Sequence, residues 1–273
     1  MGIYGLLGES LKHSISPMIH SLILKGMKKE GTYELYEVEK QEVKNSINKF
    51  KDIGALGVNV TIPYKTVVMK YIDKISEEAK KIGAVNTICF KNKITIGYNT
   101  DYTGFGMLLK NNDIDTNNKK AVVLGSGGAA KSVIAYLNDN GISEITIVSR
   151  GANITEVMHD KKQFHIIPYA EISKLKNKDI IINCTPCGMY PSVDICPIEK
   201  SSIAKFSTVV DLIYNPNETR LLKYAKELDK KAVNGLYMLI GQAVAAQELW
   251  HDIKISSSII NSIYERVKVE KYD

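Results

Sequence analysis

The chain has 273 residues, of which 44% are hydrophobic, and a formal net charge of +6 at pH 7. This length suits one large or two modest domains, and two is the better fit. No stretch approaches the roughly 20 consecutive apolar residues that cross a bilayer, and the first residues lack the basic and apolar regions of a secretory signal. The lysines form no basic stripe of the kind that binds nucleic acid, and diffuse positive charge favours small anionic ligands. We therefore expect a cytoplasmic protein that binds neither membranes nor nucleic acids.

Two of the four cysteines have the spacing of a redox or metal motif. Cys184 and Cys187 form a C-x-x-C pair, whereas Cys89 and Cys196 stand alone. The pair follows the apolar run 180–182 without the aromatic surroundings of a redox motif, and no second C-x-x-C completes a zinc site. We expect no catalytic thiol and no bound metal, and the spacing leaves a redox role of the pair open.

The first hundred residues alternate short apolar runs with helical patterns. In chain order, the expected elements are a strand at 3–7, a helix at 18–26, a strand at 33–38, a helix at 43–53, a strand at 58–61, a helix at 77–82, and strands at 86–90 and 94–98. The last two strands are three residues apart and predict a β-hairpin. This order predicts an α/β domain that begins with a βαβαβ pattern and ends near residue 100.

The pattern starts again at residue 119. Strands are expected at 121–124, 145–148, 166–167, 180–182 and 209–213, and helices after the glycine-rich turn at 125–130 and at 219–228, 236–250 and 257–268. Strands that alternate with helices in this way are typical of a doubly wound parallel sheet.

The glycine-rich turn predicts a dinucleotide site. Gly125-x-Gly127-x-x-Ala130 lies directly after the strand at 121–124 and opens a helix. In this setting glycines permit a tight turn and a close approach of the backbone to a pyrophosphate, which free N–H groups and the helix dipole stabilise. The alternative is a glycine turn that serves only packing.

The residues after the next strand indicate which nicotinamide cofactor is used. An acidic side chain there binds the adenosine ribose of NAD, whereas an arginine accommodates the 2′-phosphate of NADP. The strand at 145–148 is followed by Ser149, Arg150 and Gly151, and no acidic residue competes with Arg150. The sequence therefore predicts NADP, and a solvated surface arginine is the alternative.

Polar clusters occupy the loops that should leave the strand ends of the first domain. They are Ser14-x-Ser16-Pro17, Asn59-Val-Thr61-x-Pro63-x-Lys65, Gly83-Ala-Val-Asn86-Thr87 and Asn99-Thr-Asp101. Open α/β sheets bind ligands at such loops. These clusters are unusual for a plain core and predict a ligand site.

Further motifs follow in the second half of the chain: Asn183-x-Thr185-Pro-x-Gly188-Met189, Asp211-Leu-Ile-Tyr214-x-Pro216 and Gly235-Leu-Tyr-Met238-Leu-x-x-Gln242-Ala243. Taken with the glycine-rich turn and the four clusters before it, the set resembles the shikimate dehydrogenase family, in the family's order and over nearly the whole chain. No single motif would suffice for this resemblance.

The resemblance implies which residues bind shikimate or 3-dehydroshikimate. The hydroxyls of Ser14 and Ser16 would hold the substrate carboxylate. An alternative for Ser16 is a helix N-cap followed by proline in the first turn. The other implied substrate contacts are Thr61, Lys65, Asn86, Asp101, Tyr214 and Gln242. Taken singly, most of these residues also fit an alternative as turn or cap residues.

Lys65 and Asp101 are the expected catalytic pair. Hydride addition to a ketone leaves an alkoxide that must gain a proton, so a general acid must lie within hydrogen-bond reach. A lysine ammonium can stabilise the developing charge and donate the proton, while the Asp101 carboxylate orients it and favours its charged form. The alternative for Lys65 is a solvated surface charge.

The resemblance also implies the cofactor contacts. Arg150 would bind the adenosine end. The residues implied at the phosphates are Gly125, Ser126, Gly127, Gly128 and Ala129, and those near the nicotinamide are Thr185, Leu212, Gly235 and Met238. The family's common Asn-Arg-Thr is replaced here by Ser149, Arg150 and Gly151, so the preference for NADP rests on Arg150 and on the missing acidic residue.

The architecture that the resemblance implies has two α/β domains with a cleft between them. Residues 1–100, completed by the C-terminal helices 237–273, would form the substrate domain, and residues 101–236 a Rossmann-like, doubly wound NADP-binding domain. The implied reaction is the reversible NADPH-linked reduction of 3-dehydroshikimate in chorismate and aromatic amino acid biosynthesis, by a monomer or homodimer. The alternatives are a quinate/shikimate dehydrogenase with broader substrate or NAD use, and a non-catalytic nucleotide-sensing module.

Overall fold

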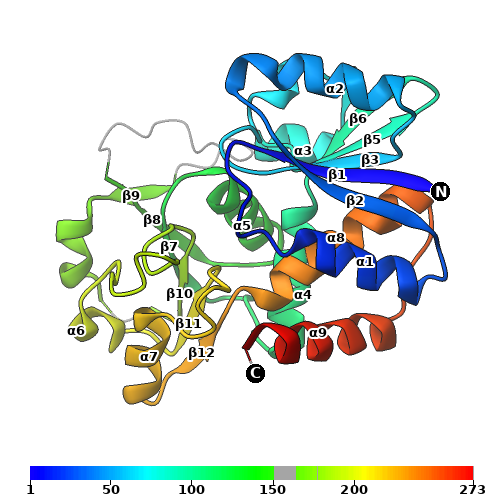
Figure 1. Cartoon of the computed structure of the whole chain (residues 1–273). Helices are drawn as coiled ribbons and strands as arrows, with labels where there is room; N and C mark the ends of the chain where they lie inside the picture. Colours follow the sequence, from blue (N-terminus) through cyan, green and yellow to red (C-terminus); the bar gives the residue numbers. More distant parts are fainter. Residues whose placement is uncertain (151–163, 177, 273) are drawn as a thin grey trace. The chain divides into compact units, whose positions relative to one another are not determined.

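A computed structural model describes residues 1–150, 164–176 and 178–272, and it divides into two compact units. Unit 1 comprises Met1–Gly104 and Ile240–Asp273, and unit 2 comprises Phe105–Leu239. Each unit is built on its own six-stranded sheet (Figure 1). The helices α4 (Thr100–Asn111) and α8 (Leu236–His251) each begin in one unit and end in the other.

Unit 1 contains a mixed sheet in the order β2-β1-β3-β5-β6-β4. Its strands are β1 (Gly2–Gly8), β2 (Gly31–Glu37), β3 (Gly57–Val60), β4 (Lys74–Ile75), β5 (Thr87–Lys91) and β6 (Ile94–Tyr98). β1 is parallel to β2 and β3, whereas β5 is antiparallel to β3 and β6. The predicted βαβαβ start and the hairpin are confirmed. The strand β4 was not predicted, because two residues are too few to form an alternating pattern.

Both faces of this sheet are covered by helices, as Figure 1 shows for α2 on one side and α1 and α8 on the other. Side chains of a strand alternate between faces. Leu7 packs with α2 and α3, while its neighbour Leu6 packs with α1 and α8. The helices of this unit are α1 (Ser16–Gly26), α2 (Val43–Asp52), α3 (Glu77–Ile82) and α9 (Ser257–Tyr272), with short 3-10 helices η1 (Lys40–Glu42) and η2 (Val68–Lys70).

Trp250 fixes the C-terminal part of α8 to the sheet of unit 1. Its indole N–H donates to the carbonyl of Ile88 at 3.1 Å, and its ring stacks on Tyr4 with a centroid distance of 5.1 Å. The indole lies directly over Gly57, where an added Cβ would be 1.8 Å from Nε1. The strand therefore needs a glycine at this position to admit the indole.

Unit 2 contains an all-parallel sheet in the order β12-β11-β10-β7-β8-β9. Its strands are β7 (Lys120–Leu124), β8 (Glu144–Val148), β9 (His165–Ile167), β10 (Ile180–Asn183), β11 (Thr208–Asp211) and β12 (Lys231–Val233). The strand order reverses between β7 and β10, as in the doubly wound dinucleotide-binding fold. The predicted Rossmann-like architecture is confirmed.

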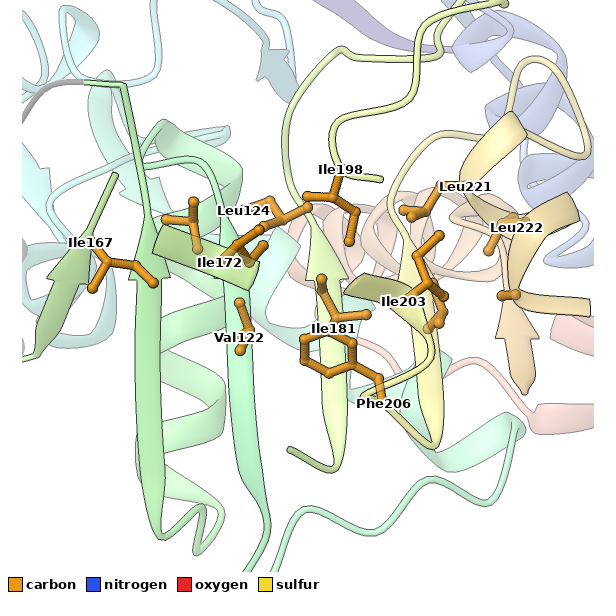
Figure 2. Close-up of a cluster of buried hydrophobic side chains, with 13 residues drawn as sticks. Val122, Leu124, Ile167, Ile172, Ile181, Ile198, Ile203, Phe206, Leu221 and Leu222 are labelled. Carbon is orange, nitrogen blue, oxygen red and sulfur yellow. The ribbon is translucent and has the colours of Figure 1, made fainter. Parts of the chain in front are cut away.

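One hydrophobic cluster of unit 2 lies between its sheet and a layer of helices. Figure 2 shows the side chains of this layer, which run from Ile167 on β9 across Val122 and Ile181 to Leu221 and Leu222 on α7. The covering helices are α6 (Lys200–Ile203), α7 (Arg220–Glu227) and the 3-10 helix η3 (Tyr169–Lys174). The helix α5 (Gly128–Asp139) follows β7 directly and buries its apolar face.

The helix α4 was not predicted from the sequence. Two glycines within its first seven residues, Gly104 and Gly106, lower its intrinsic helix propensity. Packing supplies the compensation, because the ring of Tyr136 lies against Gly106 and meets Phe105 edge-on at 5.5 Å. Tertiary contacts therefore decide the structure of this segment.

None of the helices in the described part of the chain is long and apolar enough to cross a membrane.

We expect Gly57→Ala to destabilise unit 1 by roughly 1–3 kcal/mol, because the new methyl group would displace the indole and break its hydrogen bond to Ile88. Urea unfolding of the wild type and the variant measures this difference. In a Trp250→Ala background the same substitution is expected to cost much less, since the space is then empty. An equal cost in both backgrounds would contradict this account of Gly57.

Candidate active site

A short ion pair lies at the centre of the predicted substrate site. Lys65 Nζ is 2.6 Å from Asp101 Oδ2, and the two side chains are only 14% and 10% exposed. This arrangement excludes the alternative that Lys65 is a solvated surface charge. An ammonium donates up to three hydrogen bonds, so Lys65 can donate to Asp101 and still reach the oxygen atom of a ligand.

The loop after β3 places Lys65 through its neighbours. The adjacent Tyr64 is fully buried, and its hydroxyl donates to the carbonyl of Val38 at 2.7 Å. The carbonyl of Lys65 itself accepts from the N–H of Val85 at 2.8 Å. Both sides of the lysine are thus held by buried contacts, which fixes its backbone while the side chain extends to Asp101.

Asp101 and Asn86 are held together at the start of α4. Asp101 lies in the first turn of this helix, where the helix dipole favours a negative charge. Asn86 Oδ1 accepts from the N–H of Thr100 at 2.7 Å and from the hydroxyls of Thr87 and Thr100 at 3.1 and 3.2 Å. These bonds occupy the oxygen end of the Asn86 amide, so its NH₂ end is the part directed to another acceptor.

Ser14 and Ser16 lie side by side, with a hydrogen bond of 3.1 Å between their hydroxyls. The alternative reading of Ser16 as a helix N-cap is wrong. The helix α1 begins at Ser16, and the cap position is Ile15, which makes no side-chain cap bond. The cap geometry therefore does not use the Ser16 hydroxyl.

The remaining predicted substrate contacts are spread over both units. Thr61 is half-buried after β3, and its methyl group lies against Gly8 of β1. Gln242 is half-buried on the part of α8 that belongs to unit 1. Tyr214 lies after β11 in unit 2. The structure thus pairs Lys65 directly with Asp101 and bonds Asn86 to the adjacent Thr100, whereas Tyr214 belongs to the other unit.

The glycine-rich loop of unit 2 has the shape that a phosphate group requires. Gly125 has a φ of +100°, a conformation that favours glycine. Gly127 is the N-cap of α5 without a side-chain cap bond, and a Cβ added there would have no heavy atom within 4 Å. Gly128 is the first residue of α5, and Ser126 and Ala129 flank these glycines on the chain. The uncapped N–H groups and the open space above Gly127 fit a pyrophosphate.

Arg150 follows β8 and is exposed, and the Ser149 hydroxyl next to it lies 3.4 Å from that of Ser126. The Ser149–Ser126 contact thus joins the segment predicted to bind the adenosine end of the cofactor to the glycine-rich loop. Gly151, the other altered residue of this segment, lies outside the described residues.

The residues predicted near the nicotinamide lie at the carboxyl ends of β10 and β11 and around the start of α8. Thr185 follows β10, and its methyl group lies against Gly125. Gly235 approaches Leu212 so closely that an added Cβ would be 2.0 Å from the Leu212 carbonyl oxygen. Met238 is buried in the first turn of α8.

The matches to known proteins agree with this geometry. Residues 6–88 match the shikimate dehydrogenase substrate binding domain, and residues 108–192 match shikimate / quinate 5-dehydrogenase. The shikimate dehydrogenase (NADP(+)) of Clostridium beijerinckii is 48% identical over 97% of this chain and 97% of its own. The chain belongs to the shikimate dehydrogenase family. The predicted resemblance is therefore confirmed.

Solved structures of this family have the same fold. Shikimate dehydrogenase 1 from Peptoclostridium difficile has a TM-score of 0.94 at 44% identity, covering 100% of both chains. Shikimate 5-dehydrogenase from Thermus thermophilus, in complex with NADP(H) and shikimate, has a TM-score of 0.88 at 28% identity, covering 97% of this chain and 99% of that chain. The predicted α/β fold class is confirmed.

This family member also has a buried polar line that the sequence analysis missed. The Tyr33 hydroxyl interacts with the Ser16 side chain and donates a hydrogen bond to Asn59 Oδ1 at 2.9 Å. Asn59 Nδ2 donates to Thr87 Oγ1 at 3.0 Å, and Thr87 bonds to Asn86. The line thus connects the predicted carboxylate site with Asn86. Asn59 was visible in its motif, but the pairing with Tyr33 exists only in the fold.

His20 lies beside this line and stacks on Tyr33 with a centroid distance of 3.9 Å. Burial lowers the pKa of His20 to about 3, so the imidazole is neutral. Gln247 on α8 lies 2.9 Å from His20 Nδ1. This histidine is a structural part of unit 1.

Asp211 is a further buried polar residue that was not assigned a role from the sequence. It ends β11 in unit 2 and is fully buried. Burial raises the pKa of its carboxyl to about 6, although hydrogen bonds from Thr219, Ile213 and Asn183 oppose the shift. The carboxylate form is thus retained at neutral pH at a cost in desolvation.

The cysteines carry free thiols in the described structure. Burial raises the pKa of Cys184 and Cys196 above the usual value and that of Cys89 to about 12. These thiols are therefore protonated at neutral pH, and a protonated thiol is a poor nucleophile. Among the described residues, no cluster of His, Cys, Asp or Glu could hold a metal ion.

We expect Gly127→Ala to leave the unfolding free energy within about 0.5 kcal/mol of the wild type, because the methyl group meets no neighbour. The same methyl group should lower the affinity for NADPH at least tenfold by occupying the space of the pyrophosphate. Urea unfolding and NADPH fluorescence titration measure the two effects. Unchanged affinity would show that no phosphate lies over Gly127.

We expect the pKa of Asp211 to make folding more favourable as the pH falls. A carboxyl whose pKa is about 6 when folded and near its usual 3.8 when unfolded binds a proton more readily in the folded state. The stability of the wild type relative to Asp211→Asn should therefore rise by about 1 kcal/mol between pH 7 and pH 5. Urea unfolding of both proteins at the two pH values tests this, and a constant difference would contradict the raised pKa.

Proposed function

We propose that this chain is an NADP-dependent shikimate dehydrogenase, which interconverts 3-dehydroshikimate and shikimate. The observation that carries the proposal is the sequestered ion pair between Lys65 and Asp101, 2.6 Å apart, beside the oriented amide of Asn86. The names of the relatives and the shikimate and NADP(H) in the Thermus thermophilus complex support it. In the alternative of a sensor module without activity, such a pair would have no chemical task.

All the residues assigned to the substrate except Tyr214 belong to unit 1. Ser14 and Ser16 present two adjacent hydroxyls for the carboxylate of shikimate. Lys65 and Asn86 offer donors for the ring oxygens, and Asp101 accepts from a ring hydroxyl. We assign Thr61, Gln242 and Tyr214 to the same substrate on the basis of their motifs.

NADP is assigned to unit 2. The glycine-rich loop from Gly125 to Ala129 and the N-terminus of α5 would hold the pyrophosphate, and Arg150 the 2′-phosphate. Thr185, Leu212, Gly235 and Met238 would border the nicotinamide. When bound, the reduced nicotinamide supplies the hydride, and the residues of this chain supply binding, orientation and the proton.

Lys65 acts as the general acid in the reduction. Its ammonium donates a proton to the substrate oxygen as negative charge develops there, and the neutral amine takes the proton back in the oxidation. The Asp101 carboxylate orients this ammonium through the ion pair at 2.6 Å. Asp101 in turn is held in the first turn of α4.

The assay that tests the proposal follows the absorbance of reduced nicotinamide during shikimate oxidation, with NADP and NAD at matched concentrations. We expect turnover with NADP and shikimate. Quinate is tested in parallel, because residues 108–192 match a shikimate / quinate family. Turnover with quinate or NAD would favour the broader enzyme, and the absence of turnover with every pair would favour the sensor. The cytoplasmic location and the monomeric or homodimeric state stay predictions.

We expect Lys65→Met to lower kcat for shikimate oxidation roughly 10²- to 10⁴-fold, because the reaction loses its general acid/base. The KM for NADP should change little, since Lys65 is in unit 1. Lys51→Met is the control, because Lys51 pairs with Asp73 at 3.5 Å on the surface and should retain kcat. Near-normal turnover of Lys65→Met with unchanged NADP affinity would refute the assignment.

A further inference from the structure

The Asp211 carboxylate is the hub of a buried hydrogen-bond network at the carboxyl end of the unit 2 sheet. Its Oδ1 accepts from Asn183 Nδ2 at 3.0 Å and from the N–H of Ile213 at 3.1 Å. Its Oδ2 accepts from the Thr219 hydroxyl at 2.7 Å. All three donors are neutral, and no ion pair between described residues includes Asp211.

Asn183 extends this network into the loop after β10. Asn183 Oδ1 accepts from the N–H of Thr185 at 3.0 Å and from its hydroxyl at 2.6 Å. The Thr185 hydroxyl oxygen in turn accepts from the N–H of Cys187 at 3.3 Å. The Asn183 side-chain amide therefore links two partners. Its oxygen fixes the conformation of residues 184–187, and its NH₂ group is held by Asp211.

Thr219 and Ile213 extend the network into the loop after β11. Thr219 is the N-cap of α7 and accepts from the N–H of Leu222 at 3.3 Å while it donates to Asp211. The carbonyl of Ile213 accepts from the N–H of Gly235 at 3.0 Å. One carboxylate thus holds both ends of the segment 211–219. Through Ile213 it also fixes the position of Gly235 close to Leu212.

A buried carboxylate without a cation is a costly way to join two loops, because desolvation disfavours its charge. An apolar side chain of similar volume would pack there without that cost. It could not accept the three hydrogen bonds that come from Asn183, Ile213 and Thr219. The benefit of Asp211 is therefore the defined geometry of the loops.

The position of these loops relative to the sheet indicates what they serve. In a doubly wound sheet the dinucleotide lies across the point of strand-order reversal, with one nucleotide on each side. The glycine-rich loop and Arg150 follow β7 and β8 on one side of this point. Asn183 and Asp211 end β10 and β11 on the other side, which is left for the nicotinamide nucleotide.

We propose that Asp211, together with Asn183 and Thr219, is a positioning residue for the nicotinamide half of the cofactor. It holds the loops that carry Thr185 and Leu212 in the shape that receives the nicotinamide nucleotide. It has no part in binding the adenosine half. This inference rests on the proposed function in so far as the cofactor is NADP.

The test compares two ligands that share the adenosine half. NADPH spans both halves, whereas 2′,5′-ADP has only the adenosine and its phosphates. Both are titrated calorimetrically against the wild type, Thr219→Val and Thr219→Ser. Valine has the shape of threonine without the hydroxyl, and serine keeps the hydroxyl. Thr219→Val should bind NADPH about three- to tenfold more weakly and 2′,5′-ADP within about twofold of the wild type, and Thr219→Ser should bind both ligands like the wild type.

Asp211→Asn is the second variant, because it keeps the shape of the side chain and decides the question if Thr219→Val does not fold. It should also weaken NADPH binding and spare 2′,5′-ADP. In turnover, both variants should raise the KM for NADP and leave the KM for shikimate within about twofold.

Equal losses for the two ligands would overturn the inference, since they would mean a general loosening of unit 2. Unchanged affinity for NADPH in both variants would overturn it as well. A wild type that binds neither ligand would instead overturn the proposed NADP function, so the two failures are distinguishable.

Discussion

The chemistry proposed for this protein depends on keeping a lysine ammonium and a carboxylate in contact while both are largely withdrawn from water. Removing two charges from water costs several kcal/mol for each ion, and the attraction between them offsets this only when the geometry is well defined. The described structure supplies that geometry at 2.6 Å, with Tyr64 and Val85 holding the lysine and the first turn of α4 holding Asp101. A buried ion pair of this kind says little about the stability of the fold, because desolvation offsets the attraction. It points instead to a functional site.

The two units use their sheets in different ways. In unit 1 the polar groups are joined in a buried line, from Ser16 through Tyr33, Asn59 and Thr87 to Asn86, so the proposed substrate contacts are mutually aligned. In unit 2 the loop after the central strand β7 offers backbone N–H groups without a side-chain cap and open space at Gly127. Hydroxyls and amides suit a small carboxylic acid, whereas free N–H groups at a helix end suit phosphates.

Much of this organisation could be read from local patterns. The alternation of apolar runs with helices predicted both sheets, and the motif around Gly125 predicted the glycine-rich turn that opens α5, where we propose the phosphates bind. The interpretation of Ser16 as a helix cap was wrong, because a cap depends on which residue first adopts helical angles, and that shift of one residue is not visible in Ser-x-Ser-Pro. The helix α4 was missed because Phe105 and Gly106 gain their support from Tyr136, which lies about 30 residues further along the chain.

Residue types and their order are therefore sufficient for the fold class, which follows from the alternation of strands and helices. They are also sufficient for the family and for Lys65 and Asp101 as a pair, which follow from the resemblance of the motifs. The partners of a buried polar group are a different matter, because they come from segments that only folding brings together. Asp211 looks in the sequence like the end of a strand motif, and its bonds to Asn183 and Thr219 arise when β10, β11 and α7 pack. The same packing excludes water from the carboxylate and raises its pKa, so its role is a property of the tertiary structure.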